Sequence, residues 1–276
     1  MKNRNKKLAV AASTLLLTGL LLADSKYNLK ITEQSLYFDK LPAAFDGLRI
    51  VQLSDLHGSQ FGKDNTELAQ AVKELEPDII VMTGDMADNK YNIDVFEGLL
   101  QKISGIAPCY YVSGNHEWGG LCMPQICELL EKYSVTYLSN EYMPVYVNGE
   151  KIILAGVDDP FGRADMIQPD ELAEKLREEY PDDFALLLAH RNYWVEEYYS
   201  LPLDLILCGH AHGGLIRLPL LGGMVSTKHR LIASYEKGIY HGEKFVMNVS
   251  CGLGNSVPVP RFLNRPELVS IELHKS

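Results

Sequence analysis

Five short segments of this chain carry residue types that bind metal ions, and each follows a short apolar run. They are Ser54-Asp55-Leu56-His57, Gly84-Asp85, Gly114-Asn115-His116-Glu117, Ala189-His190 and Gly209-His210-Ala211-His212-Gly213-Gly214, and they hold five of the eight histidines. Carboxylate, amide and imidazole donors without cysteine suit hard or borderline divalent cations. Ligands dispersed over five segments indicate a catalytic metal centre rather than a structural clip.

The number of donors favours two metal ions over one. The candidate ligands are Asp55, His57, Asp85, Asn115, His190, His210 and His212. Seven side chains exceed what one ion needs once water is counted, and they suit two ions about 3.5–4 Å apart that share a carboxylate and a hydroxide. Taken singly, each residue has a simpler explanation, such as an N-cap aspartate or a hydrogen-bonded core histidine. The joint pattern favours the metal centre.

The elements that must position these side chains alternate between strand and helix in the first half of the chain. Buried strands are expected at residues 48–53, 79–82 and 109–112, and helices at about 65–75, 93–103 and 124–133. This order is typical of parallel βαβ units. Because ligands gather beyond the carboxyl ends of strands in such sheets, we expect the segments to converge.

The second half predicts a second sheet. Asn148-Gly149 lies between two apolar runs and predicts a hairpin over residues 145–157. A charged helix is expected at 170–179, and strands at 184–188, 205–208, 245–250 and 268–273. Residues 27–50 are expected to form a hairpin that leads into the first core strand. With no linker, residues 27–276 are expected to form one domain with two sheets packed face to face and helices outside.

Composition excludes some classes of protein. The chain has 276 residues, of which 46% are hydrophobic and 22% charged, and this is typical of a globular protein with a sizeable core. Its formal net charge is -10 although its N-terminus is basic, which disfavours binding to nucleic acid. The five cysteines have no zinc-like spacing and indicate no disulfide framework, with a Cys122–Cys127 pair as the one alternative.

The N-terminal residues 1–26 have the pattern of a signal peptide or signal anchor. Lys2, Arg4, Lys6 and Lys7 precede the uncharged run Leu8–Ala23. The weak cleavage site favours an uncleaved anchor over secretion after cleavage, and a buried core helix is the third alternative. The basic flank predicts an N-terminus inside the cell and a domain on the extracytoplasmic face of the cell membrane.

The motifs, in this order, resemble those of the calcineurin-like metallophosphoesterases, and in particular of their membrane-anchored bacterial branch. The resemblance spans about residues 45–273 and includes Leu53–Gly58, Gly209–Gly214 and the late segment Gly252–Leu268. It implies a four-layer αββα sandwich of two mixed β-sheets flanked by helices. It also implies that Asp55, His57, Asp85 and His212 hold the first ion, while Asp85, Asn115, His190 and His210 hold the second.

The resemblance gives His116 a different role, because this position faces the substrate phosphate in the family and protonates the leaving oxygen. Three departures are visible. Glu117 replaces the common aspartate, so the carboxylate that supports His116 is expected to sit differently. Ala211 replaces a threonine, and no proline follows His190-Arg191. None of them removes a ligand.

The expected function is therefore that of a dinuclear metal-dependent phosphoesterase. A metal-bridging hydroxide would attack a phosphodiester or pyrophosphate bond, on a membrane or envelope substrate such as a lipid or a sugar-nucleotide lipid like UDP-diacylglucosamine. A phosphomonoesterase on the same site and a non-catalytic metal-binding scaffold are the alternatives. Mn, Fe, Zn and Co all suit the ligands. No nucleic acid is expected as a partner, and no protein partner is inferred.

Two further features stay open in the sequence. Arg217, Arg261 and Arg265 lie in loops that could approach the site, or they pair with nearby acids. The apolar stretch Leu215–Met224 is either an exposed lip that meets lipid or part of the core.

Overall fold

The computed structural model describes residues 2–162, 167–224 and 234–276, and its largest elements are two six-stranded mixed sheets. The strands of the first sheet lie in the order β1 (Lys30–Phe38), β14 (Glu267–Lys275), β2 (Leu48–Leu53), β3 (Ile79–Thr83), β4 (Cys109–Val112) and β5 (Thr136–Tyr137). Only the β14–β2 pair is antiparallel in this sheet.

The second sheet has a parallel centre and an antiparallel strand at each edge. Its strands lie in the order β12 (Gly238–His241), β13 (Val246–Val249), β9 (Leu205–Cys208), β8 (Ala185–Leu188), β7 (Glu150–Gly156) and β6 (Glu141–Val147). A two-stranded ribbon, β10 (Arg217–Leu218) with β11 (Gly222–Gly223), follows β9 in the chain.

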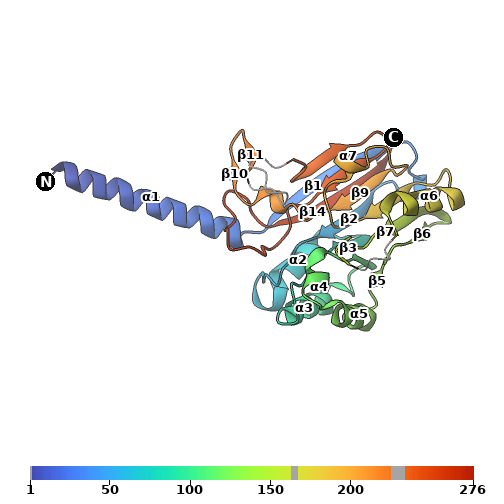
Figure 1. Cartoon of the computed structure of the whole chain (residues 1–276), viewed down its shortest axis with the longest axis horizontal. Coiled ribbons are helices and arrows are strands. Elements are labelled where there is room, and N and C mark those ends of the chain that lie inside the picture. The colour runs from blue at the N-terminus through green and yellow to red at the C-terminus, as the bar shows by residue number, and fades with distance from the viewer. Residues whose placement is uncertain (1, 163–166, 225–233) are drawn as a thin grey trace.

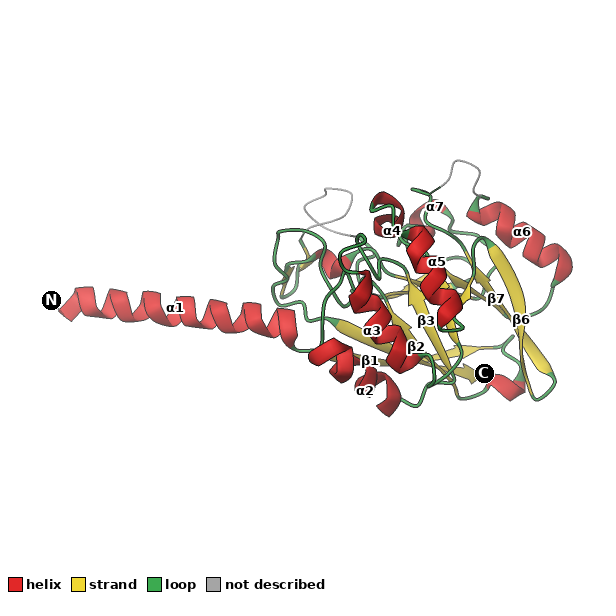
Figure 2. Cartoon of the chain, turned by 90° about the horizontal axis from the view of Figure 1, so that it is seen from below, coloured by secondary structure: helices red, strands yellow, loops and turns green. Residues whose placement is uncertain are grey.

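Helices cover the outer faces of both sheets. In Figure 2, α2 (Thr66–Glu74), α3 (Ile93–Ile103) and α5 (Met123–Lys132) lie across the first sheet. The short α4 (Asn115–Gly119) follows β4, and the second sheet carries α6 (Pro169–Glu179) and α7 (Trp194–Glu197). Three 3-10 turns complete the described elements at Ala43–Phe45, Lys63–Asn65 and His212–Gly214.

The four layers follow from the alternation of side chains along the buried strands. In β2, Ile50 points to the core between the sheets and Val51 to the core under the helices of the first sheet. In β8, Leu186 faces the core between the sheets, and Leu187 faces α6 and α7. Since side chains alternate with a period of two, a strand that is apolar throughout must be covered on both faces. The predicted αββα sandwich is confirmed.

One expected element is wrong. Residues 27–50 do not form a hairpin, because β1 is a single nine-residue strand that pairs in parallel with β14. Glu33-Gln34-Ser35 contains no glycine, proline or asparagine, so the alternation continues through these residues without a turn. The other predicted strands and helices occur within a few residues of their expected bounds.

The N-terminal segment is a helix, α1 (Lys2–Tyr27), which runs away from the sandwich (Figure 1). Among the described residues it is the one helix long and apolar enough to cross a membrane. Leu15, Leu16 and Leu20 are exposed along it. The alternative of a buried core helix is therefore wrong.

The apolar stretch Leu215–Met224 is partly buried and partly exposed. Leu215 is buried, whereas Leu220 and Leu221 at the tip of the ribbon are exposed. None of the five cysteines forms a disulfide, so Cys122 and Cys127 are not joined to each other.

Candidate metal centre

The five chemistry-bearing segments meet at the carboxyl ends of five strands that come from both sheets. Asp55 and His57 follow β2, Asp85 follows β3, and Asn115 and His116 follow β4 in the first sheet. His190 follows β8, and His210 and His212 follow β9 in the second sheet. Asp55, Asp85 and His190 are almost completely buried. The structure thus brings all seven candidate ligands and His116 together.

The first group of donors combines both sheets. The Nε2 atoms of His57 and His212 lie 3.2 Å apart, and Asp55 Oδ1 lies 3.9 Å from the first and 3.6 Å from the second. Donors about 2 Å from one tetrahedral or octahedral ion lie about 3 Å apart, so this spacing fits a divalent cation. His212 Nδ1 is buried and has no hydrogen-bond partner.

The second group of donors lies around His190. Its Nε2 atom lies 3.2 Å from Asp85 Oδ2, 3.2 Å from Asn115 Oδ1 and 3.1 Å from His210 Nδ1. Asp85 Oδ2 also lies 3.7 Å from His57 Nε2 in the first group. One carboxylate therefore stands within reach of both groups of donors.

Electrostatics favour a positive charge between these residues. Burial opposes protonation of His190, but the Asp85 carboxylate outweighs it and raises the pKa of His190 to about 10. In contrast, burial lowers the pKa of His212 to about 3, so this imidazole stays neutral and keeps a lone pair for a cation. The donor set and its charges fit two divalent ions.

Hydrogen bonds from outside the cluster orient the imidazoles. His190 Nδ1 donates to the Thr83 carbonyl oxygen, which leaves Nε2 directed at Asp85. His57 Nδ1 contacts Asp88 Oδ1 at 2.5 Å. Such second contacts fix the tautomer and ring orientation of metal-binding histidines.

Asp88 is a site residue that the sequence reasoning missed. Its Oδ1 atom contacts both His57 Nδ1 and His116 Nδ1, the latter at 2.9 Å. Burial opposes a charge on His116, yet Asp88 and Asp85 together raise the pKa of His116 above its ordinary value. The signal available in the sequence is the second aspartate three residues after Asp85.

Glu117 has another role than the support of His116. Its carboxylate accepts hydrogen bonds from the backbone N–H groups of Asp85, Met86 and Gly114 at 2.6–3.0 Å. It therefore ties the loop after β3 to the loop after β4. The carboxylate that contacts His116 Nδ1 is that of Asp88.

Strained backbone concentrates at the site. Five of the seven candidate ligands, Asp55, His57, Asp85, His210 and His212, have φ between 47° and 67°. Non-glycine residues rarely adopt this conformation unless their surroundings hold them there. A Cβ at Gly209 would lie 1.9 Å from Ser54 Oγ, so glycine is required where the loops of the two sheets approach.

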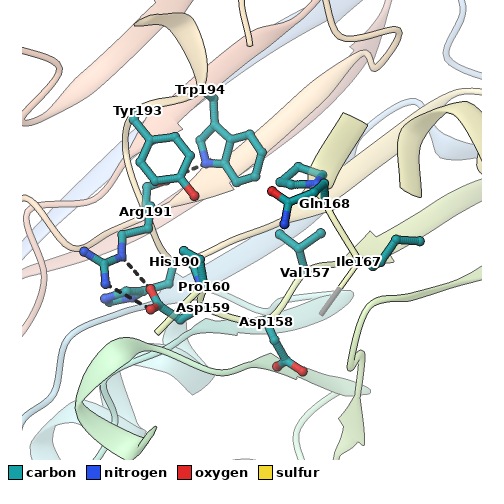
Figure 3. A pocket seen from close by; sticks show the side chains of 11 residues that line it. Val157, Asp158, Asp159, Pro160, Ile167, Gln168, His190, Arg191, Tyr193 and Trp194 are labelled. Carbon is teal, nitrogen blue, oxygen red and sulfur yellow. Dashed lines mark hydrogen bonds and ion pairs between the residues drawn. The ribbon is translucent and has the colours of Figure 1, made fainter. Parts of the chain in front are cut away.

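A second missed residue, Arg191, lies beside the second group of donors. Its guanidinium pairs with Asp159 at 2.6 and 2.9 Å, and both residues line a cavity of about 140 Å³. Figure 3 shows this pair. Arg191 Nη1 lies 3.0 Å from His210 Nε2. Burial, then the neighbouring His190 and Arg191, hold the pKa of His210 well below its usual range.

The three loop arginines have partners away from the cluster. Arg217 contacts Glu236, and Arg265 pairs with Asp24 of α1 at 2.6 and 2.7 Å. Arg261 is buried and donates to the carbonyl oxygens of Cys251, Gly252 and Gly254. None of these contacts is with a candidate metal ligand.

Comparisons with known proteins agree with this geometry. A sequence profile of the calcineurin-like phosphoesterases matches residues 48–214. The metallophosphoesterase YkuE of Bacillus subtilis is 30% identical over 255 residues, which cover 90% of this chain and 86% of that protein. The phosphodiesterase YaeI of Escherichia coli is 30% identical over 82% of each chain.

Two further proteins are similar to this chain, one in sequence and one in fold. A Danio rerio protein named transmembrane protein with metallophosphoesterase domain is 26% identical over 90% of this chain and 58% of its own length. Among solved structures, a dimetal phosphatase from Danio rerio superposes with a TM-score of 0.50 at 10% identity, over 83% of this chain and 93% of that one. The superposition supports the two-sheet fold.

Proposed function

This chain belongs to the calcineurin-like phosphoesterases, and from that premise we propose that it hydrolyses phosphodiester or pyrophosphate bonds of a membrane-associated substrate. Membership of this family makes the chain a metallophosphoesterase and confirms the family that its motifs indicated. The observation that carries the proposal is the position of Asp85 Oδ2, 3.7 Å from His57 Nε2 and 3.2 Å from His190 Nε2.

The proposal assigns two ions to the overlapping groups of donors. Asp55, His57, Asp85 and His212 hold the first, and Asp85, Asn115, His190 and His210 hold the second. Bound there, two divalent cations supply Lewis acidity that activates a water molecule and neutralises phosphate charge. These borderline ligands accept Mn, Fe, Zn or Co.

His116 donates a proton to the leaving oxygen in this proposal. It is not needed to complete either group of ligands, and its side chain is 34% exposed, so substrate can reach it. Asp88 holds His116 Nδ1 and favours the protonated ring, which leaves the opposite nitrogen to face the substrate. A protonated imidazole is an effective general acid near neutral pH.

The membrane-associated substrate rests on α1. An apolar helix behind Arg4, Lys6 and Lys7 is typical of an anchor with its N-terminus inside the cell, and the Danio rerio relative carries the word transmembrane in its name. In this proposal residues 1–26 anchor the domain of residues 27–276 on the extracytoplasmic face. Lipid phosphates and sugar-nucleotide lipids such as UDP-diacylglucosamine are then within reach.

The test is hydrolysis by the purified full chain loaded in turn with Mn, Fe, Zn or Co. We expect metal-dependent release of p-nitrophenol from bis-p-nitrophenyl phosphate, and slower release from p-nitrophenyl phosphate. Faster turnover of the monoester would replace the proposal with a phosphomonoesterase. Two bound ions without turnover of any phosphate ester, sugar-nucleotide lipids included, would leave a metal-binding scaffold.

A further inference from the structure

A groove of about 430 Å³ lies at the C-terminal end of α1 and contains none of the candidate metal ligands. One wall is formed by Leu22, Ala23 and Lys26 of α1, and the other by Leu253, Pro260 and Pro266 of the loop between β13 and β14. These side chains are mostly apolar, with one lysine among them. The groove therefore offers an amphiphile both an apolar surface and a cation.

The helix wall of the groove is held in place by specific contacts. Asp24 pairs with Arg265 through two hydrogen bonds of 2.6 and 2.7 Å, and Ser25 is completely buried against Asn264. The last turn of α1 is therefore docked on the loop rather than joined to it by a free linker. Figure 1 shows the rest of the helix continuing outward from this point.

The loop wall connects the groove to the candidate metal ligands. Leu253 N–H donates to the Ser54 carbonyl oxygen, and Gly254 N–H donates to that of Asp55 at 2.6 Å. Ser59, which also lines the groove, lies two residues after His57. The loop wall of the groove is thus hydrogen-bonded to the backbone of one proposed ligand, Asp55, and Ser59 brings the segment after another, His57, to the groove.

The same loop exposes apolar side chains beside the groove. Val257, Val259 and Leu263 are 38–45% exposed, and Asn255 fixes the turn by donating to the carbonyl oxygens of Val257 and Val259. Exposed apolar side chains next to an apolar helix favour contact with a bilayer surface.

We propose that this groove binds the hydrocarbon chain of a bilayer lipid whose phosphate ester is the substrate of the metal centre. The inference rests on the proposed function and adds a substrate class, a phosphate ester with a long alkyl chain. Leu22, Leu253 and the prolines would contact the chain, which leaves the phosphate ester free to reach the metal centre.

The experiment compares two substrates that differ only in chain length, methyl p-nitrophenyl phosphate and hexadecyl p-nitrophenyl phosphate. Both release p-nitrophenolate when water adds to phosphorus, and both are assayed with the metal-loaded full chain in mixed micelles. We expect the hexadecyl ester to have a kcat/KM about tenfold higher or more, which is the gain from burying about two methylene groups.

Ala23→Trp fills the groove from an exposed position, and Leu17→Trp places the same side chain at an exposed position on α1 outside the groove. We expect Ala23→Trp to lower kcat/KM for the hexadecyl ester to near the methyl value and to leave the methyl ester unchanged. Leu17→Trp should change neither. A photoreactive-chain phosphatidic acid should also label residues 22–27 and 253–266 of the metal-free chain, less so in Ala23→Trp.

The outcomes separate the two proposals. Equal kcat/KM for both esters, an equal effect of the two tryptophan variants, or labelling outside the groove would overturn the groove assignment and leave the proposed function standing. If neither ester is cleaved although metals are bound, the proposed function fails, and the labelling result alone then decides whether the groove binds lipid.

Discussion

The two sheets contribute unlike parts to the candidate metal centre. The loops of the first sheet supply both proposed carboxylate ligands, Asp55 and Asp85, whereas those of the second supply imidazoles only, namely His190, His210 and His212. Asp55 also accepts a hydrogen bond from the His210 N–H at 3.1 Å, so a first-sheet carboxylate positions a second-sheet loop. Neither group of donors is complete within one sheet, and the packing between the sheets sets the geometry of the site.

The largest effect should come from removing the carboxylate that reaches both groups. Asp85→Ala removes a proposed ligand of both ions, and we expect loss of both together with a fall in kcat of more than about a thousandfold. Metal content per chain, measured by plasma mass spectrometry, and turnover of bis-p-nitrophenyl phosphate provide the two readings.

The matched change in the second sheet is His212→Ala, which removes a ligand from the first group alone. It should lose one metal equivalent and keep the other. Equal losses of metal in Asp85→Ala and His212→Ala would contradict the proposal that Asp85 binds both ions and His212 only one.

His116 follows β4 of the first sheet and lies outside both proposed ligand sets, so its removal should separate metal binding from chemistry. We expect His116→Ala to retain both ions and to lose about 10²–10³-fold in kcat for a diester with phenol as leaving group. With p-nitrophenol, which leaves readily as its anion, the deficit should be much smaller. Undiminished turnover, or the same deficit with both leaving groups, would remove the proton-donor role.

Asp88 contacts two histidines that follow first-sheet strands, His57 and His116, and its replacement should have a smaller effect. Asp88→Asn weakens the contacts to His57 and His116, and we expect metal affinity to fall about 10–100-fold. Competition with a chromogenic chelator measures the affinity. Asp94→Asn, the same change at an exposed position on α3, is the control and should leave the affinity unchanged.

The contrast between the sheets also shows what sequence reasoning could reach. Residues 48–53 and 109–112 were expected as strands and match β2 and β4, because continuous apolar runs bounded by polar residues are a local signal. The parallel partner of β1 was missed, since β14 lies more than two hundred residues away in the chain and no local pattern encodes that pairing. All seven candidate ligands could be named because each stands directly after a strand.

Asp88 and Arg191 were missed as site residues for a different reason. Both act through a side chain contributed by another residue, Asp88 through His57 and His116, and Arg191 through Asp159 and His210. Such roles depend on distances across loops that spacing alone does not give. The docking of α1 through Asp24 and Arg265 could not be seen in the sequence for the same reason.

The smallest effect is expected at Glu267, a buried residue at the start of β14 that contacts both β1 and the loop after β13. It accepts a hydrogen bond from Thr32 of β1 at 2.6 Å and from Cys251 N–H after β13, and it pairs with Lys237 at 2.6 Å. Burial raises its pKa, but Lys237 and Thr32 outweigh burial and lower the pKa below the ordinary 4.5. The stabilisation is therefore complete above pH 4.5 and is lost as the pH falls through the lowered value.

Glu267→Gln should thus reduce the free energy of unfolding by about 2 kcal/mol at pH 7, the value of hydrogen bonds to a charged group. The deficit should shrink as the pH falls below 4.5, because the wild-type carboxylate then becomes neutral as well. Urea unfolding of the metal-free full chain, followed by tryptophan fluorescence, measures both. Glu272→Gln on the same strand removes a partly exposed pair with Arg49 and should cost less than about 1 kcal/mol. If the loss of unfolding free energy in Glu267→Gln stayed unchanged in acid, the stabilisation would depend on the shape of this side chain and not on its charge.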